Sequence, residues 1–148
     1  MKKLTALVLV IVTLLSLVAC GGSSLYSAAA TKSNMEKKGY EVEVIADKEE
    51  ILSELDDMTG MEFPVPTALI TGEAGDKELS IMLFASEKDA VAFKKAYEDV
   101  LSKTIEQLVA LLGEEAVKEM MGDSVALTAD KNALYQSVTA AEAKAVLG

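Results

Sequence analysis

The feature that most constrains this chain is its first segment, an apolar run from Leu4 to Val18 that follows Lys2 and Lys3. A helix that spans the hydrocarbon core of a membrane needs about 20 apolar residues. The run is shorter than that and lies at the extreme N-terminus after two positive charges, which is the layout of a cleavable secretory signal. The folded part must therefore come from the residues that follow, which suffice for one hydrophobic core.

The apolar run ends in Leu17-Val18-Ala19-Cys20, and this stretch resembles the lipobox of bacterial lipoprotein precursors. The resemblance covers only about the first 22 residues. In that family the cysteine thiol receives a diacylglyceryl group, and a dedicated signal peptidase then cuts just before the cysteine. The resemblance implies lipidation of Cys20 and a mature protein held by its acyl chains on the extracytoplasmic face of the cell membrane, or on an outer membrane where the envelope has one.

Composition then predicts three parts of the chain. Residues 1–19 are expected to be the cleaved signal peptide. Residues 20–33 are expected to be a flexible tether, because Gly21-Gly22-Ser23-Ser24 and the following small side chains offer little with which to build a core. Residues 34–148 are expected to form a single small domain.

Within that domain, apolar periodicity predicts strands at 40–46, 67–71, 78–85 and 124–128 and helices at 48–58 and 86–112, the latter resuming at 114–121. We expect Asp47 and Ser86 to cap the two main helices, and Thr139 with Glu142 to form a capping box for a final helix. The order strand, helix, strand, strand, helix, strand predicts an α+β fold of the ferredoxin-like, split βαβ type. Its antiparallel sheet would carry helices on one face, with extra terminal helices.

Several side chains on which catalysis commonly depends are missing. The chain contains no His, Arg or Trp, and its one Cys is the predicted lipidation site. Without His, a hydrolytic triad and the usual zinc, copper and haem sites are excluded. Without Arg there is no bidentate clamp for carboxylate or phosphate. We therefore predict a non-catalytic protein that has no cofactor.

Charge excludes one class of partner. The 24 Asp and Glu residues outnumber the 14 basic residues, so the formal net charge is −10. Nucleic-acid binders need basic patches that neutralise phosphates, so an excess of acidic residues argues against a nucleic-acid partner. The segment Asp130-Lys131-Asn132 has two potential oxygen ligands for calcium, but it lacks the remainder of an EF-hand loop. We expect its side chains to be solvated rather than to bind metal.

Two apolar segments are candidate interaction surfaces. The first is the loop that contains Met58, Met61 and Phe63, whose side chains serve either to plug the end of the core or to contact a partner, with the plug favoured. The second contains Leu108, Leu111 and Leu112, where apolar residues surround the helix. We expect the stretch 105–112 to leave apolar surface uncovered, since only the C-terminal helix at 140–147 is an obvious candidate to cover it.

Three functions remain open from the sequence. The leading interpretation is a membrane-tethered module that binds an unidentified protein or peptide, with a homodimer as one form of that interaction. The alternative is a binder of a small apolar ligand or a cation, which would need a cavity near the long helix and the Met58 loop. An enzyme ranks third.

Overall fold

A computed structural model describes residues 24–55, 62–121 and 126–148 of the 148-residue chain. The predicted signal helix at 4–18, Cys20, Met58 and Met61 lie outside these described residues. Among the described residues, no helix is both long and apolar enough to cross a membrane.

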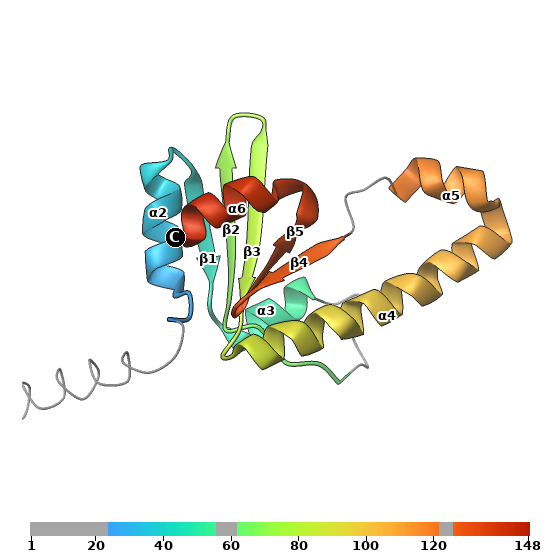
Figure 1. The fold of residues 1–148 in the computed structure, drawn as a ribbon, viewed down its shortest axis with the longest axis horizontal. Helices are drawn as coiled ribbons and strands as arrows, with labels where there is room; N and C mark the ends of the chain where they lie inside the picture. The colour runs from blue at the N-terminus through green and yellow to red at the C-terminus, as the bar shows by residue number, and fades with distance from the viewer. Residues whose placement is uncertain (1–23, 56–61, 122–125) are drawn as a thin grey trace, which may run out of the picture.

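Five strands form one antiparallel sheet with the order β1-β2-β3-β5-β4 (Figure 1). Their bounds are β1 (Glu41–Ile45), β2 (Ala68–Ala74), β3 (Lys77–Leu83), β4 (Leu127–Asp130) and β5 (Ala133–Gln136). The helices are α2 (Ala28–Lys37), α3 (Lys48–Glu54), α4 (Glu87–Leu112), α5 (Glu114–Met121) and α6 (Ala140–Leu147), with a 3₁₀ turn η2 (Ser137–Thr139) before α6. The strand β3 occupies the centre, as its almost continuous apolar run predicts.

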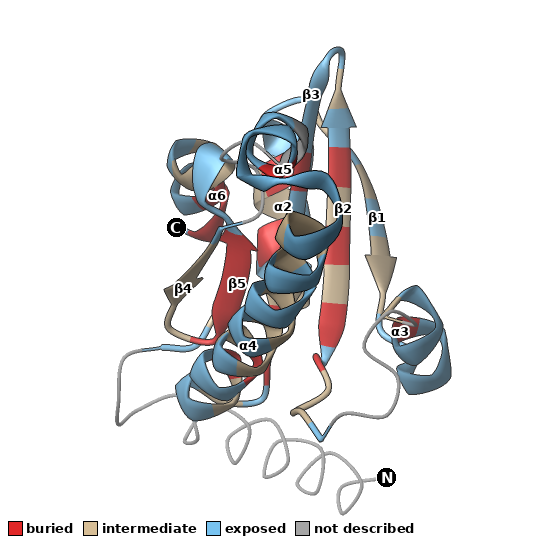
Figure 2. Cartoon of the chain, turned by 90° about the vertical axis from the view of Figure 1, so that its right-hand side faces the viewer, coloured by how far each residue is buried: buried red, intermediate tan, exposed pale blue. Residues whose placement is uncertain are grey.

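One face of the sheet carries the larger core, which α2 and α6 cover. Alternate residues of β2 and β3 point into it, including Ile70 and Ile81, and Met35 of α2 and Val146 of α6 pack against them. These four side chains are fully buried. The red positions that alternate along β2 in Figure 2 mark its inward-facing residues.

The opposite face carries a smaller core under the N-terminal part of α4. Phe93 of α4 lies 5.2 Å from Phe84 and from Phe63, measured between ring centroids, and Leu134 of β5 joins this cluster. The Phe84–Phe93 rings are tilted and the Phe63–Phe93 rings lie edge to face. In both arrangements the quadrupoles of the two rings interact favourably. Helices thus cover both faces of the sheet, and the prediction of helices on one face only is wrong.

The α+β class and the antiparallel sheet are confirmed, but the split βαβ arrangement is not. That arrangement separates the first two strands by a third one, whereas β1 and β2 are hydrogen-bonded neighbours, with Val44 opposite Ile70. The sequence prediction also missed β5. The segment Asp130-Lys131-Asn132, considered above as a calcium loop, is instead the turn of the β4–β5 hairpin, where Lys131 has a positive φ of 52°.

The predicted tether is also too long. Residues 28–33 belong to α2, whose N-cap Ser27 accepts a hydrogen bond from the Ala30 amide. Thr31 is buried with 1% of its surface exposed, so this small-residue stretch packs closely on the sheet rather than remaining flexible. The folded unit therefore includes residues 28–33 and does not begin at residue 34.

The helix starts were predicted with mixed success. Asp47 accepts hydrogen bonds from the Glu49 and Glu50 amides at 2.9 and 3.1 Å, and Ser86 accepts one from the Asp89 amide at 3.1 Å. These two caps are confirmed. The Thr139 hydroxyl instead donates to the Gln136 carbonyl, because η2 continues directly into α6, and the predicted capping box at this described position is wrong.

Candidate interaction surfaces

The helix α4 is longer than the sheet that supports it. Its 26 residues correspond to about 39 Å at the usual helical rise. The N-terminal part packs on the sheet through Ala90 and Phe93, which are buried. The C-terminal part continues beyond the sheet and turns back at Gly113 into α5 (Figure 1). We call residues 101–121 the arm.

The end of the arm exposes adjacent leucines. Leu111 has 80% of its surface exposed and Leu112 has 52%, whereas Leu108 is half-buried. Val117 of α5 is buried, so α5 covers only part of this end of α4. The helix α6 packs against α2 and the sheet. The prediction that stretch 105–112 leaves apolar surface uncovered is confirmed; whether Leu108, Leu111 and Leu112 bind a partner stays a prediction.

The second predicted surface is represented by Phe63 alone, since Met58 and Met61 are outside the described residues. Phe63 is half-buried and packs edge-to-face on Phe93, with an interplanar angle of 89°. Pro66 of the same segment is buried. For Phe63, the plug at the end of the core is the observed role.

A third surface was not predicted from the sequence. The segment that precedes α2 is docked on the β4–β5 turn by the side chain of Asn132. Its Oδ1 accepts from the Tyr26 amide at 2.7 Å, and its Nδ2 donates to the Tyr26 carbonyl at 3.0 Å and to the Phe84 carbonyl at 2.9 Å. The Lys131 Nζ donates to the Ser24 carbonyl at 3.3 Å and lies 4.7 Å from the centroid of the Tyr26 ring. We call this set of contacts the N-terminal latch.

The latch also places two tyrosines near one carboxylate. Partial burial, then the charge of Asp130 and its hydrogen bond from the phenol, raise the pKa of Tyr26. Burial is also the main cause that raises the pKa of Tyr135, followed by the charges of Asp130 and Tyr26. The Tyr135 hydroxyl has no hydrogen-bond partner among the described residues. Both phenols therefore stay protonated at neutral pH.

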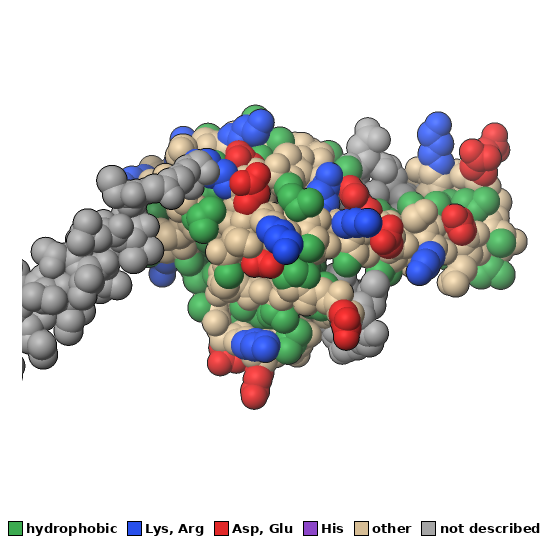
Figure 3. Space-filling model, turned by 60° about the horizontal axis from the view of Figure 1, so that its bottom comes forward, with side chains coloured by type: hydrophobic (Ala, Val, Ile, Leu, Met, Phe, Trp, Pro, Cys, Tyr) green, Lys and Arg blue, Asp and Glu red, His purple; other side chains and the backbone are tan. Residues whose placement is uncertain are grey.

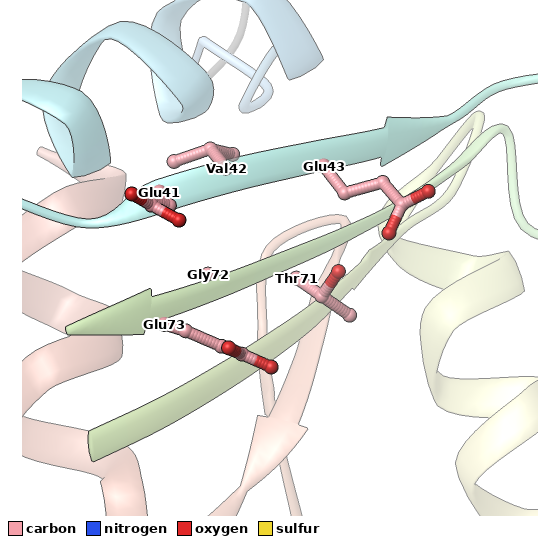
Figure 4. A pocket seen from close by; sticks show the side chains of 6 residues that line it. All are labelled: Glu41, Val42, Glu43, Thr71, Gly72 and Glu73. Carbon is pink, nitrogen blue, oxygen red and sulfur yellow. The ribbon is translucent and has the colours of Figure 1, made fainter. Parts of the chain in front are cut away.

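Shallow hollows lie on the surface of the described part of the chain, and two are lined as follows. The first, of about 320 Å³, lies along β1 and β2 and is lined by Glu41, Val42, Glu43, Thr71, Gly72 and Glu73. Figure 4 shows the three carboxylates spread along the strands rather than converging on one point. The second, of about 380 Å³, is lined by Ala46, Lys48, Val65, Pro66 and Thr67. In the described part of the chain, no group of three or more carboxylates or other metal-ligating side chains is placed to hold a metal ion.

The remaining surface is of mixed character. On the face shown in Figure 3, acidic and basic side chains are interspersed, and hydrophobic side chains lie between them along the arm. Two ion pairs on helix surfaces, Lys32 with Glu36 and Lys94 with Glu98, have the usual one-turn spacing.

No protein-family model matches the chain, and no curated protein or solved structure is significantly similar to it. Function must therefore be argued from the surfaces themselves.

Proposed function

We propose that the protein is an extracytoplasmic lipoprotein, held on the cell membrane by lipid attached to Cys20. The support is the order of positive charge, apolar run and lipobox-like sequence at the N-terminus. The Ser24 carbonyl, four residues after Cys20, already accepts a hydrogen bond from Lys131 of the domain, which suits a protein that is anchored close to its folded part. Lipidation is tested by mass spectrometry of the mature protein, which should begin at a lipid-modified cysteine and should lose that modification in the variant Cys20→Ser.

We propose further that the domain is a non-catalytic module that binds a protein or peptide through the end of the arm. The observation that carries this proposal is the exposure of Leu111 and Leu112, where the long helix has left the sheet. An exposed leucine in isolation is common on protein surfaces, but two successive leucines, which point about 100° apart, give the end of a projecting helical hairpin an apolar surface on two neighbouring sides. The arm and α2 lie at opposite ends of the molecule, so the anchor leaves the arm accessible (Figure 1).

The sequence and the structure support this class over the alternatives. The chain has no His or Arg for catalysis, and both described hollows are shallow features of the surface. A small apolar ligand requires a site that buries most of its area. The carboxylates along β1 and β2 do not converge, so no described feature favours the cation-binding alternative.

The test is a comparison between two positions of the same helix. A photo-crosslinking amino acid is placed at Leu112 in one variant and at Val91 in another, since both side chains have 52% of their surface exposed. Crosslinking is performed in intact membranes. We expect a discrete adduct from position 112 that position 91 does not give, and we expect Leu111→Lys to abolish the adduct without a change in thermal unfolding.

Each outcome has a defined meaning. An adduct of twice the mass of the protein would identify the homodimer form of the interaction, and a heavier or lighter adduct would identify another partner. Equal crosslinking from the two positions, or none from either, would overturn the arm as the binding surface. Unfolding of Leu111→Lys would contradict the observed exposure of this side chain.

A further inference from the structure

We propose that the N-terminal latch is a membrane-contact surface, which lies on the bilayer to which the lipid of Cys20 is attached. This inference rests on the proposed lipidation. The surface consists of Leu25, Tyr26 and Lys131, and its occupant is the headgroup region of the lipid. Three observations carry it: the docking of the chain at Tyr26, the short length of chain back to Cys20, and the chemistry of the exposed side chains.

The segment around Tyr26 is held by specific hydrogen bonds from one place in the fold, the β4–β5 turn. Asn132 is buried with 3% of its surface exposed, and its amide holds both the N–H and the carbonyl of Tyr26. Lys131 binds the Ser24 carbonyl from the same turn. The folded domain therefore extends to Ser24, and only residues 20–23 separate it from the acylated sulfur.

That length limits how far the domain can lie from the lipid. A chain of four residues spans at most about 14 Å even when fully extended. The headgroup layer on each side of a bilayer is itself about 5 to 7 Å thick. The latch must therefore lie within roughly 10 Å of the headgroups. A tether that ran through residue 33 would have allowed the domain to lie much farther from the membrane.

The side chains at this position suit the membrane interface. Leu25 has 48% of its surface exposed although it is a large apolar residue. The Tyr26 ring is amphipathic and half-buried against the larger core, its phenol donates to Asp130, and the Lys131 ammonium lies over the ring. Interfacial regions of membrane proteins are enriched in tyrosine, and lysine there can keep its charge in water while its stem lies in apolar surroundings. An exposed apolar, a half-buried aromatic and a basic side chain thus lie on the part of the domain that the anchor holds within about 10 Å of the headgroups.

The test uses the absence of Trp from the chain, which makes one introduced Trp a unique fluorophore. The variant Leu25→Trp is compared with Val138→Trp, whose position is similarly exposed at 58% but follows the other end of β5. Each full-length lipoprotein is matured in cells, purified, confirmed to be lipidated by mass spectrometry, and inserted into phosphatidylcholine vesicles that contain lipid brominated in the upper acyl chain. Thermal unfolding by circular dichroism verifies that both variants fold.

We expect the fluorescence of Leu25→Trp to be blue-shifted and to be quenched about twofold more strongly than that of Val138→Trp. Equal quenching of the two variants, or quenching of neither, would overturn the membrane-contact surface while leaving the lipoprotein proposal intact. An unmodified cysteine in the mass spectrum would overturn both proposals, so the two failures are distinguishable.

A second measurement tests Lys131. The variant Lys131→Glu in the Leu25→Trp background should lessen the quenching in vesicles that contain anionic phosphatidylglycerol, and unchanged quenching there would contradict the role of Lys131.

Discussion

Replacing Asn132 with alanine should destabilise the protein far more than the loss of one surface amide would. The side chain is buried and makes three hydrogen bonds, two with the backbone of Tyr26 and one with the carbonyl of Phe84. A hydrogen bond contributes about 1 kcal/mol net, and each buried group left without a partner adds to the cost. The expected loss for Asn132→Ala is therefore about 3 kcal/mol.

The assay is urea unfolding of the purified protein followed by circular dichroism. With a urea dependence of roughly 1 to 3 kcal/mol per molar, the midpoint should fall by about 1 to 3 M. Asn34→Ala is the matched control, since its amide donates only one hydrogen bond, to the Val146 carbonyl at 2.8 Å, and should cost about 1 kcal/mol. Hydrogen exchange should also accelerate at the Tyr26 amide in Asn132→Ala. Equal losses in the two variants would refute the argument that Asn132 holds the N-terminal segment.

Three further predictions follow from packing and charge. Phe93→Ala, which removes the ring shared by both aromatic pairs, should cost about 3 to 5 kcal/mol in urea unfolding; a loss below 1 kcal/mol would contradict the smaller core. Gly72→Ala should cost about 1 to 2 kcal/mol, because the added methyl would overlap the end of the Met35 side chain, and unchanged stability would show that Met35 moves freely. The pKa of Tyr135 is raised in the folded state. Its contribution to the free energy of unfolding is therefore fully present below the ordinary tyrosine pKa and is lost as the pH rises from that value through the folded-state pKa. Urea midpoints should therefore fall on the alkaline side of about pH 10, and Tyr135→Phe should weaken that fall; an identical pH profile would refute the assignment.

The helix starts could be predicted because they depend on local chemistry. The Asp47 and Ser86 side chains cap amides two or three residues further along the chain, so the pattern is visible in a short window.

The exposure of Leu111 and Leu112 could also be predicted from the sequence. Successive residues of a helix turn by about 100°, and a single sheet cannot cover every side of a helix that is apolar all round.

The place of β4 at the edge of the sheet could not be predicted in the same way, because it depends on one short strand. The residues Ala133–Gln136 form only four positions, too few for alternation to be distinguished from a helix or loop. Yet β5 lies between β3 and β4 and supplies Leu134 to one core and Tyr135 to the other. The available signal was the polar Asp130-Lys131-Asn132 turn flanked by short apolar stretches, which is typical of a hairpin.

The N-terminal latch was missed for a different physical reason. Its hydrogen bonds join Tyr26 to Asn132, which are separated by 106 positions, and neither residue belongs to a periodic pattern. Small side chains in residues 28–31 suggested a tether because they bury little apolar area individually. Ala28 and Thr31 instead face the core and allow α2 to approach the sheet closely, with Thr31 and Met35 fully covered.

With the proposed lipid anchor on Cys20, the position where the folded domain begins determines how the proposed binding surface on the arm is presented. A tether through residue 33 would let the domain rotate freely, so that no face would have a fixed relation to the membrane. With the latch in place, the body is restrained at one end by the chain that enters at Ser24, while α4 carries Leu111 and Leu112 toward the other end (Figure 1). Release of the latch by Asn132→Ala should therefore broaden the set of adducts obtained from position 112 in intact membranes, even at temperatures where the domain stays folded. An unchanged adduct pattern would show that the arm reaches its partner without help from the restrained N-terminus.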